Sequence, residues 1–245
     1  MSLSVRRVTD PHDPALEAFG RIQEAAYYQP EMLIPAEYFG PMIVQPPQTG
    51  QRQNIILVAE QGGEVVGGTL FHLLSSGAGF SSFMGVAQSA RGTGAARALH
   101  RARMQIIGEV GAVGVFADAV HRQALSAEDL AAEARVGSDP TLRRVKLGAL
   151  GFFTVDIPYW QPVGGPEGGP LKDLDLLYCP LETSGTVSLR LVTDTMQAYW
   201  QSWLGADRAA EEAAALAQRT EPNPTGQSSV ALLSATERPK AFSQS

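Results

Sequence analysis

Two closely spaced glycines mark the part of the sequence best suited to chemistry. Gly92 and Gly94 lie in the run Arg91-Gly92-Thr93-Gly94-Ala95-Ala96, between a predicted strand and an amphipathic helical pattern over 94–110. Glycine lets the backbone approach a ligand closely and adopt conformations that other residues resist. The start of a helix offers unpaired N–H groups and the positive end of the helix dipole. The run therefore predicts a site for a phosphate or pyrophosphate group.

Two common phosphate-binding patterns do not fit this run. The pattern G-x-x-x-x-G-K-S/T is absent, because no lysine follows the glycines. The dinucleotide pattern G-x-G-x-x-G is met only in part, because Arg97 stands where the third glycine belongs. The strands predicted before the run form an antiparallel meander, which also argues against a Rossmann unit. A nucleotide-binding enzyme is therefore the least favoured interpretation.

The run resembles the central motif of the GCN5-related N-acetyltransferases (GNAT), written Q/R-x-x-G-x-G/A. Arg91, Gly94 and Ala96 stand at its three fixed positions, although Gln88 replaces a proline that is usual just before it. The stretch 147–152, Leu-Gly-Ala-Leu-Gly-Phe, is similar to the family's K-L-G-F signature. The order of predicted strands and helices matches as well, and the resemblance covers roughly residues 3–182.

The resemblance implies an α/β (α+β) fold: a mixed, mostly antiparallel sheet with a central parallel pair of strands, flanked by helices. We expect a GNAT-like domain over 1–182, with an inserted helical segment over 121–139 that shapes acceptor specificity or only decorates the fold. Residues 183–245 are expected to form a helical extension with a mobile tail. Trp200 and Trp203 in this extension would form a homo-oligomer contact or fold back onto their own domain.

The resemblance also implies an acyl-CoA-dependent N-acyltransferase. Acetyl would pass from acetyl-CoA to a primary amine by direct attack in a ternary complex, with no metal. The alternative is a non-catalytic sensor or regulatory module that binds CoA or acetyl-CoA on the same fold. The residues implied in cofactor binding are the strand end that would line the pantetheine arm and the loop whose amides would hold the pyrophosphate: Met84, Gly85, Val86, Arg91, Gly92, Thr93, Gly94, Ala95 and Ala96.

The usual acid and base of the family are missing from this sequence. Leu147 stands where many members have a tyrosine that protonates the thiolate, and residues 80–86 contain no carboxylate. The remaining candidates are Asp118 and His121 as bases, after the strand predicted over 112–117, and Tyr159 as the acid. An enzyme that relies on proximity without a dedicated base also stays open.

Three other positions allow two interpretations each. His72 would face either the cleft or the surface of the sheet, and His100 is expected to be exposed among arginines. Tyr27 and Tyr28 would pack in the core or line a substrate pocket, because pockets favour aromatic side chains.

The composition of the chain limits the kinds of partner that the protein could bind. The net charge of −6 and the pI near 5.3 argue against a nucleic-acid binder and an anionic membrane surface. They favour a cationic or neutral acceptor, either a small-molecule amine or a protein amine. Four histidines and the single Cys179 are scattered without metal-ligand spacing, and Cys179 is expected to be buried. The absence of a long apolar stretch and of a secretory signal at the N-terminus predicts a cytoplasmic protein.

The predicted elements follow from hydrophobic periodicity and turn residues. A helix is expected to begin at Asp13-Pro14, a hairpin to turn at 61–63, and a capping box to start a helix at Ser126. Strands are expected over 3–9, 55–60, 64–74, 80–86, 112–117, 152–155 and 174–181; further helices over 126–135, 140–150 and, as one long pattern, 189–218.

Overall fold

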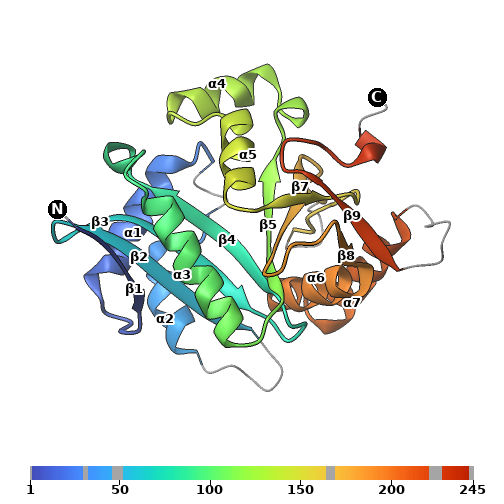
Figure 1. Ribbon diagram of the computed structural model, residues 1–245, viewed down its shortest axis with the longest axis horizontal. Coiled ribbons are helices and arrows are strands. Elements are labelled where there is room, and N and C mark those ends of the chain that lie inside the picture. Colours follow the sequence, from blue (N-terminus) through green and yellow to red (C-terminus); the bar gives the residue numbers. More distant parts are fainter. Residues whose placement is uncertain (1, 30–32, 46–51, 164–168, 221–227, 243–245) are drawn as a thin grey trace.

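The computed structural model describes residues 2–29, 33–45, 52–163, 169–220 and 228–242 (Figure 1). Its strands are β1 (Leu3–Val8), β2 (Gln53–Gln61), β3 (Glu64–Leu73), β4 (Gly79–Val86), β5 (Gly114–Val120), β6 (Phe153–Val155), β7 (Leu174–Pro180), β8 (Thr186–Ser188) and β9 (Ser229–Ser234). Its α-helices are α1 (Pro14–Ala26), α2 (Phe39–Val44), α3 (Ala95–Glu109), α4 (Ala127–Arg135), α5 (Pro140–Ala149), α6 (Leu189–Leu204) and α7 (Ala206–Gln218). Short 3₁₀ turns are η2 (Ala36–Tyr38), η3 (Gln88–Ala90), η4 (Arg122–Ala124) and η5 (Lys240–Phe242).

The strands form one mixed sheet in the order β1-β2-β3-β4-β5-β7-β6-β9-β8. Strands β1 to β4 are antiparallel neighbours, and β4 and β5 are a parallel pair joined through α3. A parallel pair needs a crossover connection of this kind. The predicted α/β fold, with its central parallel pair, is confirmed.

Local sequence signals account for several element ends. Asp13 caps α1 by accepting a hydrogen bond from the amide of Ala15, and Ser126 with Asp129 forms the predicted capping box of α4. The hairpin between β2 and β3 turns on Gly62 and Gly63, whose φ angles are 65° and 85°. These positive values are ones that glycine adopts without strain.

Helices cover both faces of the sheet. On one face α3 packs on side chains such as Phe71 and Val115, with the end of α5 beside it. On the other face α1 and α2 pack on Leu70 and Phe83, while α6 and α7 pack on Phe116 and its neighbours. Alternate residues of each strand therefore face different helices, as the period of two in a strand requires.

The helical pattern over 189–218 is two helices, not one. Gly205, with a φ of 79°, separates α6 from α7, and the two pack against one another. Trp200 on α6 is fully buried, so this helix folds back onto its own domain. Trp203 stays 36% exposed, and an oligomer contact there remains a prediction.

The predicted mobile tail is wrong for residues 228–242. These residues include β9, which pairs with β6 on one side and with β8 on the other. The rest of the predicted tail, 221–227 and 243–245, lies outside the described residues. The period-two pattern of Val230 and Leu232 was short and surrounded by polar residues, which hid it in the sequence.

A buried ionic cluster fixes this C-terminal segment to the domain. Arg144 of α5 lies 3.2 Å from the carboxylate of Asp175, and Arg238 lies 3.3 Å from it. Arg144 also donates to the carbonyl of Ala235 at 2.5 Å and to that of Glu237 at 2.9 Å. Burial raises the pKa of Asp175, while its two arginine neighbours lower it. One helix thus holds the segment after β9.

His100 is buried, contrary to the expectation. It accepts a hydrogen bond from Arg103 at 2.6 Å. Burial is the largest cause that lowers its pKa, to about 4, and the positive charge of Arg103 is the second. Arg103 in turn donates to Ser81 of β4 at 2.5 Å. Both side chains lie on the face of α3 that meets the sheet. Cys179 is buried, as predicted, and burial raises its pKa to about 11.

None of the helices in the described part of the chain is long and apolar enough to cross a membrane.

Candidate functional site

The parallel strands β4 and β5 separate partway along their length. Their pairing ends at Ser81 and Ala117, while β4 continues to Val86 and β5 to Val120. Figure 1 shows β4 and β5 diverging from one another. We call the opening between residues 82–86 of β4 and 118–120 of β5 the wedge. Backbone groups of β4 along the wedge have no partner strand in β5, so the wedge can accept an extended ligand.

A β-bulge lies at the closed end of the wedge. The β3–β4 register shifts there, because Leu70 pairs with Phe83 while Phe71 pairs with Ser81. Ser82 is the extra residue, and a bulge re-aims the side chain that it carries. The Ser82 hydroxyl lies 2.6 Å from Nε2 of His72 and 3.0 Å from the hydroxyl of Tyr199 on α6.

His72 belongs to a buried polar chain rather than to the cleft. Its Nδ1 lies 2.8 Å from Oδ1 of Asn54, an acceptor atom, so Nδ1 carries the proton and Nε2 accepts. Nε2 is also 2.7 Å from Nη2 of Arg52. Burial, and then the charge of Arg52, lower the pKa of His72 well below its usual value. The ring is therefore neutral and a poor proton acceptor.

Asp118 lies across the wedge from Ser82. Each is the first residue of its strand beyond the last β4–β5 pair. The Tyr159 hydroxyl is 3.4 Å from Oδ2 of Asp118 and also bonds to Oε1 of Gln161. Burial raises the pKa of Asp118 to about 6, and the hydrogen bond from Tyr159 partly offsets this rise. The structure thus brings together two of the three predicted catalytic residues.

The third, His121, is not part of this group. It follows Asp118 by three positions along an extended backbone, so its side chain projects to the opposite face. Its Nδ1 accepts from the amide of Gln123 at 3.2 Å, and its Nε2 lies 3.3 Å from the carbonyl of Thr236. Burial lowers its pKa. His121 helps to hold the C-terminal turn and is not beside Asp118.

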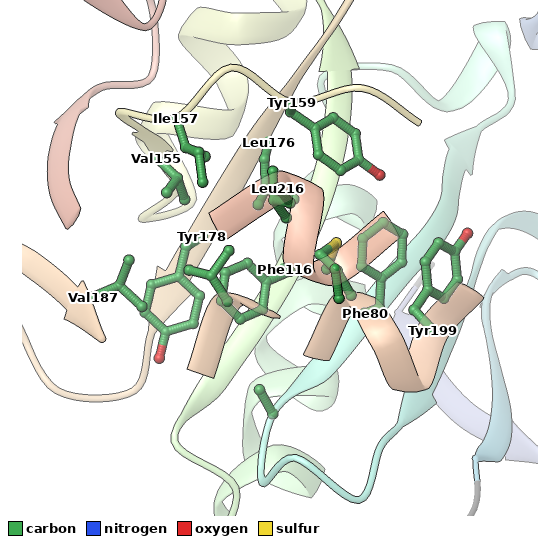
Figure 2. Packing of buried hydrophobic residues seen from close by; sticks show 14 of the residues in the cluster. Phe80, Phe116, Val155, Ile157, Tyr159, Leu176, Tyr178, Val187, Tyr199 and Leu216 are labelled. Atoms are coloured by element: carbon green, nitrogen blue, oxygen red, sulfur yellow. The ribbon is translucent and has the colours of Figure 1, made fainter. Parts of the chain in front are cut away.

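Sequence reasoning missed Tyr199. Its ring stacks on Phe80 with the centroids 3.7 Å apart, and it is 9% exposed. Figure 2 shows the hydroxyls of Tyr159 and Tyr199 pointing toward the same side of the cluster. Tyr199 lies 117 positions from Ser82 in the sequence, so no local pattern could connect the two.

The glycine loop leads directly into α3 through two glycines with positive φ. Gly94 is the N-cap of α3, and the φ angles of Gly92 and Gly94 are 86° and 93°. A Cβ added at either glycine would meet no atom within 4 Å, so both face open space. Thr93 stabilises the turn by donating its hydroxyl to the carbonyl of Ala90 at 2.7 Å. The loop is thus preformed and accessible to a ligand.

Arg91 has a partner that the sequence did not suggest. Its Nη1 donates to the carbonyl of Gly137, between α4 and α5, at 2.5 Å. The inserted segment therefore touches the glycine loop. A pocket of about 280 Å³ is lined by Arg91, by Val86 and by α1 residues that include Arg21. Arg21 also forms an exposed ion pair with Glu17 at 2.6 Å.

The remaining predicted cofactor residues lie at the open end of β4 and at the start of α3. Gly85 faces α1, because a Cβ there would lie 3.6 Å from Ile22. Met84 faces the α3 side, where it packs against the core. Ala95 is buried as the first residue of α3. Together with the loop, these residues form a continuous edge from the bulge to the start of α3.

Aromatic residues border the wedge on the face of α1. Tyr27 packs on Phe83 with the ring centroids 5.1 Å apart, yet it is 37% exposed. Tyr27 lies close enough to Asp118 on β5 and to Glu133 on α4 for both carboxylates to act on its hydroxyl. It therefore lies near both the wedge and α4. The described residues contain no group of three or more His, Cys, Asp or Glu side chains that could hold a metal ion.

Residues 16–135 match the model of the Acetyltransferase (GNAT) family. This part of the chain is therefore similar to the GNAT family. No curated protein sequence matches the chain.

Two solved structures have a similar fold. A GNAT-family protein from Desulfovibrio desulfuricans is 15% identical, with 74% of this chain and 100% of that chain covered and a TM-score of 0.50. A tandem GNAT protein from the clavulanic acid biosynthesis pathway is 16% identical, with 65% and 46% covered and a TM-score of 0.50. At such identities the likeness shows the fold alone.

Proposed function

We propose that this protein is an acetyl-CoA-dependent N-acetyltransferase that acts on a primary amine. The observation that carries the proposal is the pairing of a preformed glycine loop with the wedge and, at the closed end of the wedge, Asp118. An extended ligand anchored at the loop would run along β4 from Val86 to Ser82, a length of about 13 Å at ~3.3 Å per residue. It would end there, because the paired strands close the wedge at Ser81.

Each part of this edge has a role in the proposal. The amides of Arg91 to Ala96 bind the pyrophosphate at the positive end of the α3 dipole. The free backbone of β4 pairs with the amide groups of the pantetheine arm. Bound acetyl-CoA supplies an activated acyl group at the closed end, where backbone N–H groups stabilise the oxyanion that develops on its carbonyl.

Asp118 serves as the base. It accepts a proton from the amine nitrogen as the C–N bond forms, and its raised pKa of about 6 suits this role near neutral pH. Tyr159 is a positioning residue, since its hydroxyl lies between Asp118 and Gln161. A carboxylate near two tyrosine rings also suits a cationic ammonium group before it loses its proton.

The acceptor would enter past Tyr27 and the inserted segment. We expect Tyr27→Ala to raise the KM of the amine about tenfold through loss of ring contacts, while the Kd of acetyl-CoA stays within twofold. Steady-state kinetics and calorimetry measure the two quantities. Tyr38→Ala is the matched control, because Tyr38 is 53% exposed on η2. Equal effects of the two variants would contradict this entry path.

Calorimetric titration tests cofactor binding directly. The unmodified protein is expected to bind acetyl-CoA and CoA, and Gly94→Trp to lose binding, because an indole would fill the open space above the loop. Gly63→Trp is the matched control: Gly63 has a similar φ of 85° and similarly open surroundings, but it lies in the β2–β3 hairpin. No binding by the unmodified protein would overturn the proposed function.

A second function is favoured by one observation. Leu147 packs against the core at the position where many family members carry the tyrosine that acts as general acid. The absence of a tyrosine at this position suits a sensor that binds CoA without turnover. Release of free thiol from acetyl-CoA, with and without a panel of primary amines, separates the two functions. Binding without any release would favour the sensor.

A further inference from the structure

We propose that Tyr199 is the general acid that protonates the departing thiolate of CoA. The inference rests on the proposed acetyltransferase function and names a catalytic residue from the C-terminal helix α6. Tyrosine supplies this proton in many family members from the position of Leu147. In this protein the hydroxyl would come from the opposite face of the sheet.

Tyr199 is held at the closed end of the wedge. Its hydroxyl is 3.0 Å from Ser82 Oγ, and Ser82 is the first β4 residue beyond the last β4–β5 pair. A ligand that follows β4 from the glycine loop ends at this point. Stacking on Phe80 and an edge contact with Trp203, at a centroid distance of 4.9 Å, fix the ring. The hydroxyl is thus placed beside the bond that must break.

Hydrogen-bond directions show that this hydroxyl is a donor. Nε2 of His72 has no proton, so Ser82 donates its proton to His72. The Ser82 oxygen is then free to accept from Tyr199. Burial, as the largest cause, raises the pKa of Tyr199 well above its usual value, so the phenol stays protonated at neutral pH. The Tyr199 hydroxyl needs only to rotate about its C–O bond to donate to the CoA sulfur instead of to Ser82.

Arg52 provides the charge that a tyrosinate needs. Its guanidinium carbon lies 5.3 Å from the centroid of the Tyr199 ring. Its hydrogen bonds go to the neutral groups of Asn54, His72 and Ser202. The positive charge of Arg52 therefore lowers the pKa of Tyr199. A largely buried guanidinium with neutral partners would stabilise the negative phenolate oxygen as it forms.

Tyr159 is less suited to this step. Its hydroxyl faces two acceptors, Oε1 of Gln161 and Oδ2 of Asp118, and its side chain is fully buried. Trp200 also donates to the same Gln161 oxygen, at 3.1 Å, which fixes that oxygen as an acceptor. The single proton of Tyr159 is therefore already engaged by these two acceptors.

The protons and electrons balance. The amine nitrogen forms the new C–N bond and gives one proton to Asp118. The C–S bond breaks with its electron pair on sulfur, and the O–H proton of Tyr199 forms the S–H bond of CoA. When the products leave, the tyrosinate takes a proton from water, and Asp118 releases one to water. No oxidant, reductant or metal takes part.

The test compares Tyr199→Phe with Tyr178→Phe. Tyr178 is the matched control, because it is a buried tyrosine of the same core cluster whose hydroxyl donates to the carbonyl of Val113 at 3.0 Å, away from the wedge. We expect Tyr199→Phe to lower kcat about 10²-fold or more, with the Kd of acetyl-CoA and the KM of the amine within twofold. Tyr178→Phe is expected to leave kcat within about threefold.

A graded substitution separates catalysis from packing. Incorporating 3-fluorotyrosine at position 199 lowers the phenol pKa with little change in shape, so kcat should change by more than twofold and its pH dependence should shift. Unchanged kcat and pH dependence, or an equal loss in Tyr178→Phe, would overturn the role of Tyr199. Failure of the unmodified protein to release thiol would instead overturn the proposed function, and this inference with it.

Discussion

Asp118→Asn is expected to lower kcat/KM about 10²- to 10⁴-fold and, at the same pH, to make the protein more stable. The loss of activity follows because an amide cannot accept the amine proton. The gain in stability follows because Asp118 is ionised at neutral pH in a site that favours the neutral form. Few substitutions are expected to move activity and stability so far in opposite directions.

The sign of the stability change follows from the two pKa values of Asp118. The carboxyl has a pKa of 3.8 in a model compound and about 6 in the folded protein. The folded state therefore binds this proton more tightly than the unfolded state. The stability that it contributes is fully present below pH 3.8 and is lost as the pH rises through about 6. A difference of about two pKa units corresponds to roughly 3 kcal/mol at pH 8.

Urea unfolding at pH 4 and pH 8, together with a pH profile of kcat/KM, checks both halves of this prediction. The activity of the unmodified protein should rise as the pH increases through about 6. The control is Asp173→Asn, which removes a neighbouring carboxylate that raises the pKa of Asp118. A variant at position 118 that keeps full activity would show that Asp118 is not the base.

Arg144→Met is expected to cost about 3–5 kcal/mol of stability, because it leaves the buried carboxylate of Asp175 without one of its two cations. It also removes the donors that bind the carbonyls of Ala235 and Glu237. The segment after β9 should therefore loosen before the rest of the sheet. Hydrogen exchange over residues 229–238 and urea unfolding measure the two effects.

Two further variants define the cause. Arg190→Met removes an exposed pair with Asp194, whose arginine side chain is 87% exposed, and should cost less than about 1 kcal/mol. Adding Asp175→Asn to Arg144→Met should recover part of the loss, because the uncompensated charge is gone. If both arginine variants cost the same, the buried cluster contributes no special stability.

The glycine loop and the central sheet could be predicted because their signals are local. Gly92, Gly94 and the helical pattern after them lie within a few turns of chain, and each cap or hairpin uses adjacent residues. The wedge needed only the order of strands that the family resemblance supplied. Asp118 and Tyr159 were found as candidates because each lies near the end of a predicted strand.

The rest of the site depends on packing between distant segments. Tyr199 reaches Ser82 only because α6 folds back across the sheet, and the direction of Ser82 depends on a bulge that no sequence pattern marks. His121 was a reasonable candidate because it is close to Asp118 in the sequence. Three positions along an extended backbone, however, place its side chain on the opposite face of the sheet. Gly205 was read as part of a helix, although it divides two helices.

The position of β9 has a consequence for how this protein is made. Strand β6 ends at Val155, yet one of its two neighbours in the sheet is β9, which begins at Ser229. A ribosome that has just finished β7 has therefore produced a sheet with an unpaired edge at β6 and an Arg144 that lacks its carbonyl partners Ala235 and Glu237. The central sheet and the glycine loop can form during synthesis, but this edge closes only after β9 has left the exit tunnel.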